Sequence, residues 1–328
     1  MNRRRFAVVL AALALATASC SSPTPAPVAE TGASAYPMKL ASPFGESILD
    51  AAPVRVAVIT SVDLDIALAL GIKPVISATP AADLTEYEKA AIGKNGFGDI
   101  PSYASTDGTD FEAIAAADPD VILATSGWSL DTDYAKLAKI APVVSYTGQD
   151  GLTKLTWKER LTIAGKALNK PAEAEKIVTD AKEALVDART ANPAFQGKTL
   201  SFIVVHPGQI TYFNDPQSGS NLLFAELGFA GTKVASEFNA DNSQVSLENL
   251  QKIDADVLLM AYPFGANGIL SRTDLEANPL FGSLGAVKRG DYVVLDDAVP
   301  ASIAYATPLS EPWVLSKILP ELQRVTAG

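Results

Sequence analysis

Hydrophobic and polar positions repeat within this chain at one long interval. Residues Phe111–Leu123 read FEAIAAADPDVIL, and residues Leu247–Leu259, 136 positions later, read LENLQKIDADVLL. Both stretches have the pattern of a short helix, a tight turn and a buried strand. Solenoid repeats have periods of about 20–50 residues, so this longer interval indicates a duplicated lobe instead. Two similar lobes on one chain imply a cleft between them.

The pattern around the first repeat predicts alternating strands and helices. The β-branched run Val54–Thr60 predicts a strand, Asp63–Leu70 has the apolar stripe of a helix that stops at Gly71, and Lys73–Ile76 predicts a second strand. Further elements are expected as helices at 111–117 and 133–139 and strands at 121–125 and 143–146, with an irregular stretch at 83–103. Continuous apolar strands between helices favour a parallel sheet covered on both faces.

The middle of the chain predicts helices. Residues 156–168 have helical spacing, and Pro171 suits the first position of a second, amphipathic helix that ends near Asn192. About twenty residues at 1.5 Å each give that helix a length of ~30 Å. Strands are then expected at 200–205, 257–261 and 292–295, and helices at 221–227, 247–253, 274–281 and 311–325. The expected fold is α/β, with two doubly wound lobes of mostly parallel sheets joined by a long helix.

The N-terminus has the pattern of an export signal. Three arginines at positions 3–5 precede the apolar segment Phe6–Ala16, which is too short to span a ~30 Å bilayer core stably. Small residues then lead to Cys20, the single cysteine of the chain. This arrangement resembles a lipobox, in which the cysteine is lipidated, although Thr17 stands where an aliphatic residue is usual. The alternative is an ordinary secretory signal with an incidental cysteine, and export by either the Sec or the twin-arginine route stays open.

These features predict the organisation of the chain. A signal peptide is expected at 1–19, the lipidated Cys20 with a Pro/Ser/Ala-rich flexible tether at 20–50, an N-terminal lobe at 51–155, a helical connector at 156–193 and a C-terminal lobe at 194–328. The formal net charge of −11 argues against nucleic-acid binding, because phosphate affinity needs a basic surface. We expect an extracytoplasmic lipoprotein anchored to the cell membrane.

In order and spacing, the motifs of the chain resemble those of the iron–siderophore receptors of ABC importers. The stretches that carry the resemblance are VRVAVITSVDLDIALALGIKPV, FEAIAAADPDVIL, KLAKIAPVV, WKERLTIAGKALNK, VSLENLQKIDADVLL and NPLFGSLGAVKRGDYVVLD, from about Arg55 to Leu322. The resemblance implies a periplasmic-binding-protein-like receptor whose lobes are joined by one long helix. It also implies that a ferric siderophore is bound and delivered to an ABC permease dimer with its ATPase, without catalysis and without a resident cofactor.

Ligands of doubly wound sheets bind outside the carboxyl ends of the strands. That rule places the residues that follow four of the expected strands at the cleft: Ser61–Asp63, Ser126–Trp128, His206–Gly208 and Tyr262–Phe264. Aromatic side chains there suit a ferric siderophore, which presents flat apolar faces. The resemblance singles out Trp128, and Tyr305 in a loop expected at 300–305. For Trp128, Tyr262 and Tyr305 the alternative role is an aromatic side chain that plugs the surface of a lobe.

An anionic chelate would call for arginine. Hydroxamate-binding relatives carry an arginine upstream of the helix that begins here near Thr109, whereas this chain has Tyr-Ala-Ser-Thr at 103–106. Arg272 and Lys94 are the remaining basic candidates, with solvated surface charge as the alternative role of each.

The resemblance gives Glu112 and Glu248 another role, because one acidic residue on each lobe docks onto an arginine pocket of each permease subunit in this family. The alternative is electrostatics at a helix end, since Thr109 and Glu112 fit a capping box, which Val245 breaks in the second lobe.

Other ligands and an enzymatic role fit the sequence less well. A zinc or manganese receptor needs several histidine and carboxylate ligands, and His206 is the single histidine. Haem needs an axial ligand, which His206 or Tyr262 could provide, so haem stays an alternative, as does cobalamin. The sequence contains no G-x-S-x-G elbow, phosphate-binding loop or H-E-x-x-H motif, and we expect no enzyme.

Overall fold

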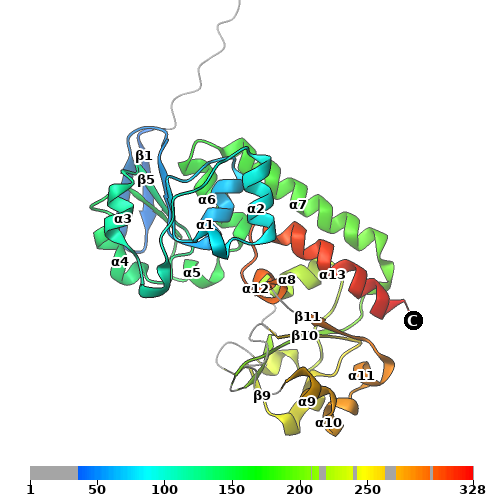
Figure 1. Ribbon diagram of the computed structural model, residues 1–328. Helices are drawn as coiled ribbons and strands as arrows, with labels where there is room; N and C mark the ends of the chain where they lie inside the picture. The colour runs from blue at the N-terminus through cyan, green and yellow to red at the C-terminus, as the bar shows by residue number, and fades with distance from the viewer. Residues whose placement is uncertain are drawn as a thin grey trace, which may run out of the picture. The chain divides into compact units, whose positions relative to one another are not determined.

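A parallel sheet organises the N-terminal half of the computed structural model, which describes residues 36–207, 209–213, 219–238, 242–262, 271–295 and 298–327 (Figure 1). Its strands are β3 (Val56–Val58), β4 (Ile76–Ser77), β5 (Val121–Ala124) and β6 (Val143–Ser145), in the order β4-β3-β5-β6. Every residue of these strands is buried. Burial on both faces is why these strands read as continuous apolar runs in the sequence.

The C-terminal sheet is mixed. Its strands are β7 (Leu200–Val205), β8 (Ile210–Phe213), β9 (Gln244–Val245), β10 (Val257–Ala261) and β11 (Tyr292–Leu295), in the order β11-β10-β7-β8-β9. β11, β10 and β7 are parallel as expected, whereas β8 and β9 add an antiparallel edge that the sequence pattern did not predict. An antiparallel edge on an otherwise parallel sheet is common in doubly wound folds.

Helices and single turns connect these strands. The α-helices beside the sheets are α1 (Ser61–Ala69), α2 (Glu86–Lys94), α3 (Phe111–Ala116), α4 (Leu130–Leu137), α8 (Gly219–Glu226), α9 (Arg272–Glu276), α10 (Pro279–Gly282) and α11 (Gly285–Arg289). The 3-10 turns are η1 (Ala81–Asp83), η2 (Ser105–Asp107), η3 (Pro193–Phe195), η4 (Ala235–Glu237) and η5 (Leu247–Ile253). In the described part of the chain, no helix has the length and apolarity that a bilayer span requires.

The connector consists of α5 (Gly151–Lys154), α6 (Trp157–Ala167) and the long α7 (Pro171–Ala191), and the chain closes with α12 (Val299–Ala304) and α13 (Ser310–Thr326). Pro171 begins α7 as expected. Ala174, near the start of α7, packs in a core of the N-terminal half, whereas Leu185, near its end, packs in a core of the C-terminal half. Figure 1 shows α13 running beside α7, so both halves share these helices.

The two repeats occupy equivalent places in the two sheets. β5 pairs with β3 and β10 pairs with β7, so each repeat supplies the neighbour of the first strand of its sheet. The aspartate just before each repeated strand ties down the start of that partner strand. Asp120 accepts hydrogen bonds from the backbone N–H groups of Val54 and Arg55 at 2.8 and 2.9 Å, and Asp256 accepts one from Thr199 at 2.7 Å. The glycines that stop α1 and α8, Gly71 and Gly228, both have positive φ.

Several sequence expectations differ from the structure, and one of them is the helix expected at 274–281, which is divided into α9 and α10. Residues 83–103 are not irregular, because they contain α2, which begins with a capping box between Thr85 and Glu88. Residues 38–49, assigned to the tether, form the hairpin of β1 (Met38–Ser42) and β2 (Gly45–Leu49), whose Leu49 reaches the core. The second repeat begins with the 3-10 turn η5 where an α-helix was expected.

The expected capping box of α3 is also wrong. The N-cap is Asp110, which accepts from the backbone N–H of Ala113, and the hydroxyl of Thr109 donates to Asp133.

We predict that removing either strand-anchoring aspartate lowers stability by a similar, modest amount. Asp120→Ala and Asp256→Ala should each lower the free energy of unfolding by about 1 kcal/mol at pH 7, since each leaves backbone donors at a strand start without a charged acceptor. Urea denaturation of the purified chain measures this, with the exposed Asp50→Ala as the matched control. Equal midpoints for all three variants would contradict the anchoring role.

Candidate ligand-binding site

Two adjoining cavities lie at the carboxyl ends of β3 and β5. Their volumes are about 320 and 540 Å³, within the range of small-molecule sites. The first extends along the α5–α6 segment toward α8 and α13, and the second extends along the segment from Ala78 to Glu88 toward α12. Four residues border both cavities: Val62, Ser126, Trp128 and Tyr305. The location follows the rule for doubly wound sheets.

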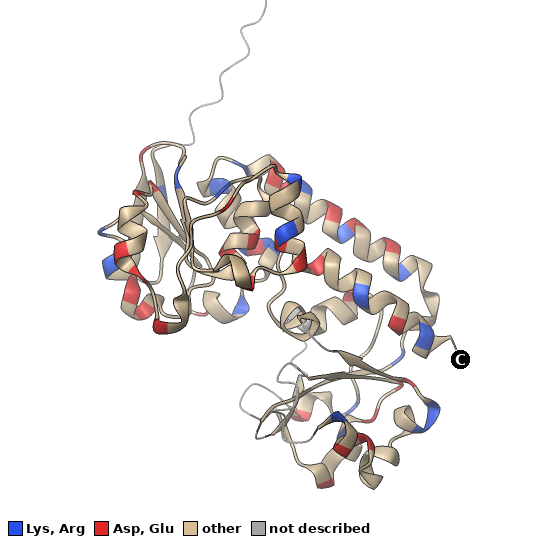
Figure 2. Ribbon diagram, in the orientation of Figure 1, with Lys and Arg blue, Asp and Glu red and all other residues tan. Residues whose placement is uncertain are grey.

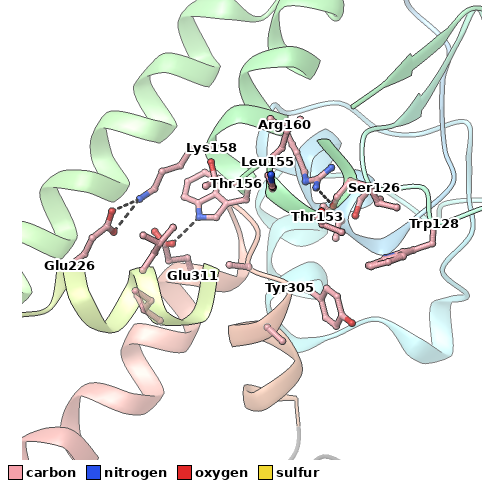
Figure 3. Close-up of a pocket in the computed structure, with 18 residues that line it drawn as sticks. Ser126, Trp128, Thr153, Leu155, Thr156, Lys158, Arg160, Glu226, Tyr305 and Glu311 are labelled. Atoms are coloured by element: carbon pink, nitrogen blue, oxygen red, sulfur yellow. Dashed lines mark hydrogen bonds and ion pairs between the residues drawn. The ribbon is translucent and has the colours of Figure 1, made fainter. Parts of the chain in front are cut away.

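Trp128 and Tyr305 present large aromatic surfaces where the cavities meet. Trp128 is 64% exposed and Tyr305 is 60% exposed, although both are side chains that are usually covered. Figure 3 shows the two rings on the same side of the site. Tyr305 is the C-cap of α12, so residues 300–304 are helical and not the loop that the sequence suggested. The structure thus brings together two of the predicted aromatic residues, from different halves of the chain.

A buried carboxylate fixes the two loops that lead into the cavities. Asp63, in the first turn of α1, accepts hydrogen bonds from the backbone N–H and the hydroxyl of Thr125 at 2.9 and 2.6 Å, and from the hydroxyl of Thr60 at 2.6 Å. Burial raises the pKa of Asp63, while these hydrogen bonds act in the opposite direction. Because Thr125 directly precedes Ser126, Gly127 and Trp128, this network sets where the Trp128 loop begins.

Arg160 of α6 extends this network and was missed by the sequence analysis. Its guanidinium is buried and donates to the backbone carbonyls of Thr125, Gly151 and Leu152. Desolvation lowers the pKa of Arg160, and the nearby Asp63 carboxylate opposes that shift. The signal was present, since Arg160 shares the apolar stripe of its helix with Trp157 and Ala164.

Further carboxyl groups lie in the cavity walls. Asp65 and Glu88, both 2% exposed, line the second cavity, and Asp65 accepts from the hydroxyl of Thr307 at 2.6 Å. Burial and the neighbouring Glu88 raise the pKa of Asp65 well above its usual value. The Oδ1 atom of Asp65 is buried without a donor among the described residues. A proton held by Asp65 would allow a hydrogen bond to Glu88.

Glu311 occupies a similar position in the first cavity. Its Oε2 atom accepts from the indole N–H of Trp157 at 2.8 Å, and burial raises its pKa. Its Oε1 atom is buried and has no donor among the described residues.

Neither cavity is lined by His206, Tyr262, Arg272 or Lys94. His206 contacts the hydroxyl of Thr211 at 2.9 Å, and burial lowers its pKa. Tyr262 is packed in a core of the C-terminal half, and burial raises its pKa to about 12. Arg272 pairs with Glu276 at 2.9 Å, and Lys94 is exposed at the end of α2. Cys20, Gly208, Pro263 and Phe264 lie outside the described residues.

Glu112 and Glu248 are exposed on the surface, in the first turns of α3 and η5 respectively. Over the described ranges, His, Cys, Asp and Glu side chains form no group of three or more that could hold a metal ion.

This fold and its cleft are those of a two-lobed solute receptor. The family model described as periplasmic binding protein matches residues 56–299, and the chain belongs to that family. It is therefore a substrate-binding protein and not an enzyme.

Named relatives confirm the resemblance to iron–siderophore receptors. The chain is 28% identical over 246 residues to the Fe(3+)-citrate-binding protein YfmC of Bacillus subtilis, covering 75% of this chain and 74% of the relative. It is 26% identical over 267 residues to the probable siderophore-binding lipoprotein YfiY of the same species, covering 76% and 77%.

Solved structures agree with this relationship. The structure of PiaA from Streptococcus pneumoniae in complex with ferrichrome matches with a TM-score of 0.72 and 28% identity, covering 88% of this chain and 98% of PiaA. A periplasmic solute-binding protein from Mycobacterium smegmatis matches with a TM-score of 0.74 and 25% identity, covering 88% and 98%.

We predict that Asp65→Asn stabilises the protein increasingly as pH rises. An acid whose pKa is raised by folding binds its proton more tightly in the native state. The stability that it contributes is fully present below the unfolded pKa of about 3.9 and is lost as pH rises through the folded pKa. Asparagine can still accept from Thr307 and can donate to Glu88 at any pH.

Urea unfolding between pH 4 and pH 8 tests this. The advantage of Asp65→Asn over the unsubstituted chain should grow with pH to about 1–3 kcal/mol, the cost of a buried group with an unmade hydrogen bond. Asp50→Asn, at an exposed position, is the control. A difference that is constant with pH would refute the shared proton.

Proposed function

We propose that this chain is an extracytoplasmic receptor that binds a ferric siderophore around Trp128 and Tyr305 and delivers it to an ABC importer. The observation that carries the proposal is the pair of exposed aromatic rings at the junction of two cavities. A ferric siderophore wraps its metal in an organic shell, so its receptor needs apolar contact area and hydrogen-bonding groups more than direct metal ligands. Relatives named for ferric citrate and siderophore binding support the same class of ligand.

The cavity walls also provide the polar contacts that such a shell requires. Hydroxyl groups of Ser61, Thr79, Ser126 and Ser302 belong to residues that line the second cavity. Hydroxyl groups both donate and accept, so they can bind amide and carbonyl groups of a chelator in either sense. The potential haem ligands His206 and Tyr262 line neither cavity, which favours a siderophore over haem.

We further propose that Cys20 carries the lipid that holds the receptor at the outer face of the cell membrane. Its place after an apolar export segment supports this, as does the relative named a lipoprotein. A diacylglyceryl group with a further acyl chain anchors stably, whereas one chain alone binds reversibly.

The proposed contact with the permease uses Glu112 and Glu248. Both are exposed. The repeats that contain them occupy equivalent places, because β5 pairs with β3 in one sheet and β10 pairs with β7 in the other. Equivalent acidic groups on two lobes suit a partner built from two similar subunits.

Trp128→Ala should lower the affinity for a ferric siderophore about tenfold, because it removes an aromatic contact worth about 1.4 kcal/mol. Isothermal titration calorimetry of the purified chain with ferrichrome measures the affinity. Val186→Ala, which removes an exposed apolar side chain from α7, is the matched control and should leave the affinity unchanged. Equal affinities for both variants would place the ligand elsewhere.

Glu112→Lys combined with Glu248→Lys should reduce uptake of radiolabelled ferric siderophore by cells at least tenfold, because charge reversal turns attraction for a basic pocket into repulsion. The affinity of the purified double variant for the siderophore should not change. Glu183→Lys, on the exposed face of α7, controls for net charge. Normal uptake, or a loss of siderophore affinity, would rule out the docking role.

A further inference from the structure

The basic side chains that line the cavities are already committed to partners. Lys154 pairs with Asp150 at 2.9 Å, and Lys158 pairs with Glu226 at 3.3 Å. Arg160 donates to backbone carbonyls. Figure 3 shows the Lys158–Glu226 pair across the first cavity from Trp128. The charge of each of these two lysines is therefore already balanced by a carboxylate.

The second cavity is acidic. Asp65, Asp83 and Glu88 line it, and among the described residues no Lys or Arg does so. Even with one proton shared, the Asp65–Glu88 pair retains one negative charge in the wall. Asp83 is exposed at the end of η1, so its carboxylate is accessible to a ligand. The opposite wall gives no compensation, because α12 contains no charged residue (Figure 2).

A second feature adds a buried acceptor to the wall of the first cavity. Glu311 is 6% exposed and lines the first cavity, and its Oε1 atom has no donor among the described residues. The internal segments outside the described residues, at 208, 214–218, 239–241, 263–270 and 296–297, contain four aspartates and neither lysine nor arginine. Those segments therefore contain no lysine or arginine that could offset the acidic groups of the second cavity.

We propose that the cleft selects ferric chelates of zero or positive net charge, the trihydroxamate class, and that Asp83 pairs with a cationic arm of the chelate. The inference rests on the proposed function of ferric siderophore binding. Three monoanionic hydroxamates neutralise Fe(III), whereas three dianionic catecholates leave a triple negative charge and citrate complexes are also anionic. Bringing an anion against this wall places like charges together, which is unfavourable. The preference separates this chain from the relative named for ferric citrate.

The test compares ligands that differ in charge. Ferrioxamine B carries a pendant ammonium, and its N-acetyl derivative is the same ferric trihydroxamate without that charge. Titration of the purified chain should show about tenfold tighter binding of ferrioxamine B, a difference that shrinks as salt rises. Ferric citrate and a ferric tricatecholate should bind at least a hundredfold more weakly than either.

Asp83→Asn should abolish the tenfold difference in affinity between the two trihydroxamates. Asp107→Asn, at an exposed position of η2 that lines neither cavity, should retain the difference. Tight binding of an anionic chelate, or equal binding of the two trihydroxamates by the unsubstituted chain, would overturn the inference while leaving the proposed function intact. If Asp83→Asn still prefers ferrioxamine B over its N-acetyl derivative, Asp83 is not the partner of the cationic arm. Failure of every ferric chelate to bind would overturn the proposed function itself.

Discussion

The site depends on one buried interaction, the hydrogen bonding of Asp63 to Thr125. It joins the first turn of α1 to the end of β5. Residues that line the cavities follow β3 and β5 at these two places. Arg160 binds the carbonyl of the same Thr125 and two carbonyls of α5, so three loops meet at one charged cluster. Because both buried groups are hydrogen-bonded and attract each other electrostatically, the cluster tolerates burial that an isolated charge could not. Trp128 follows directly and takes its position from it.

The opposite wall is held by the chain that returns from the C-terminal half. Thr307 donates to Asp65, Glu311 accepts from Trp157, and the indole of Trp313 donates to Glu86 at 2.9 Å. These bonds fix the α12–α13 segment, with Tyr305 at the end of α12, against helices of the N-terminal half. Together with the shared helices α7 and α13, they favour small movements of the lobes on ligand binding over wide hinge closure, because closure would have to break buried hydrogen bonds.

Much of this fold could be predicted from the sequence, because buried parallel strands read as apolar runs and duplicated aspartates mark equivalent turns. The bounds of β7 and β11 and the start of α7 are as expected. The pattern did not predict β8 and β9, which are short edge strands whose pairing depends on tertiary context. It also did not predict α2, because this helix has a weak apolar stripe and its clearest sequence signal is its capping box. At the site, Trp128 and Tyr305 were predicted. Asp65 and Glu311 were not, because a buried charge is recognised only once its partners are known, and Arg160 was missed although it lies on the apolar stripe of α6.

The most direct test of the account is the position of the iron. Crystals grown with a ferric trihydroxamate would show it by anomalous scattering at the iron edge. The account predicts a single iron peak beside the rings of Trp128 and Tyr305, with no protein atom directly coordinating the metal. An iron peak beside His206 or Tyr262, or bound directly by protein carboxylates, would contradict it.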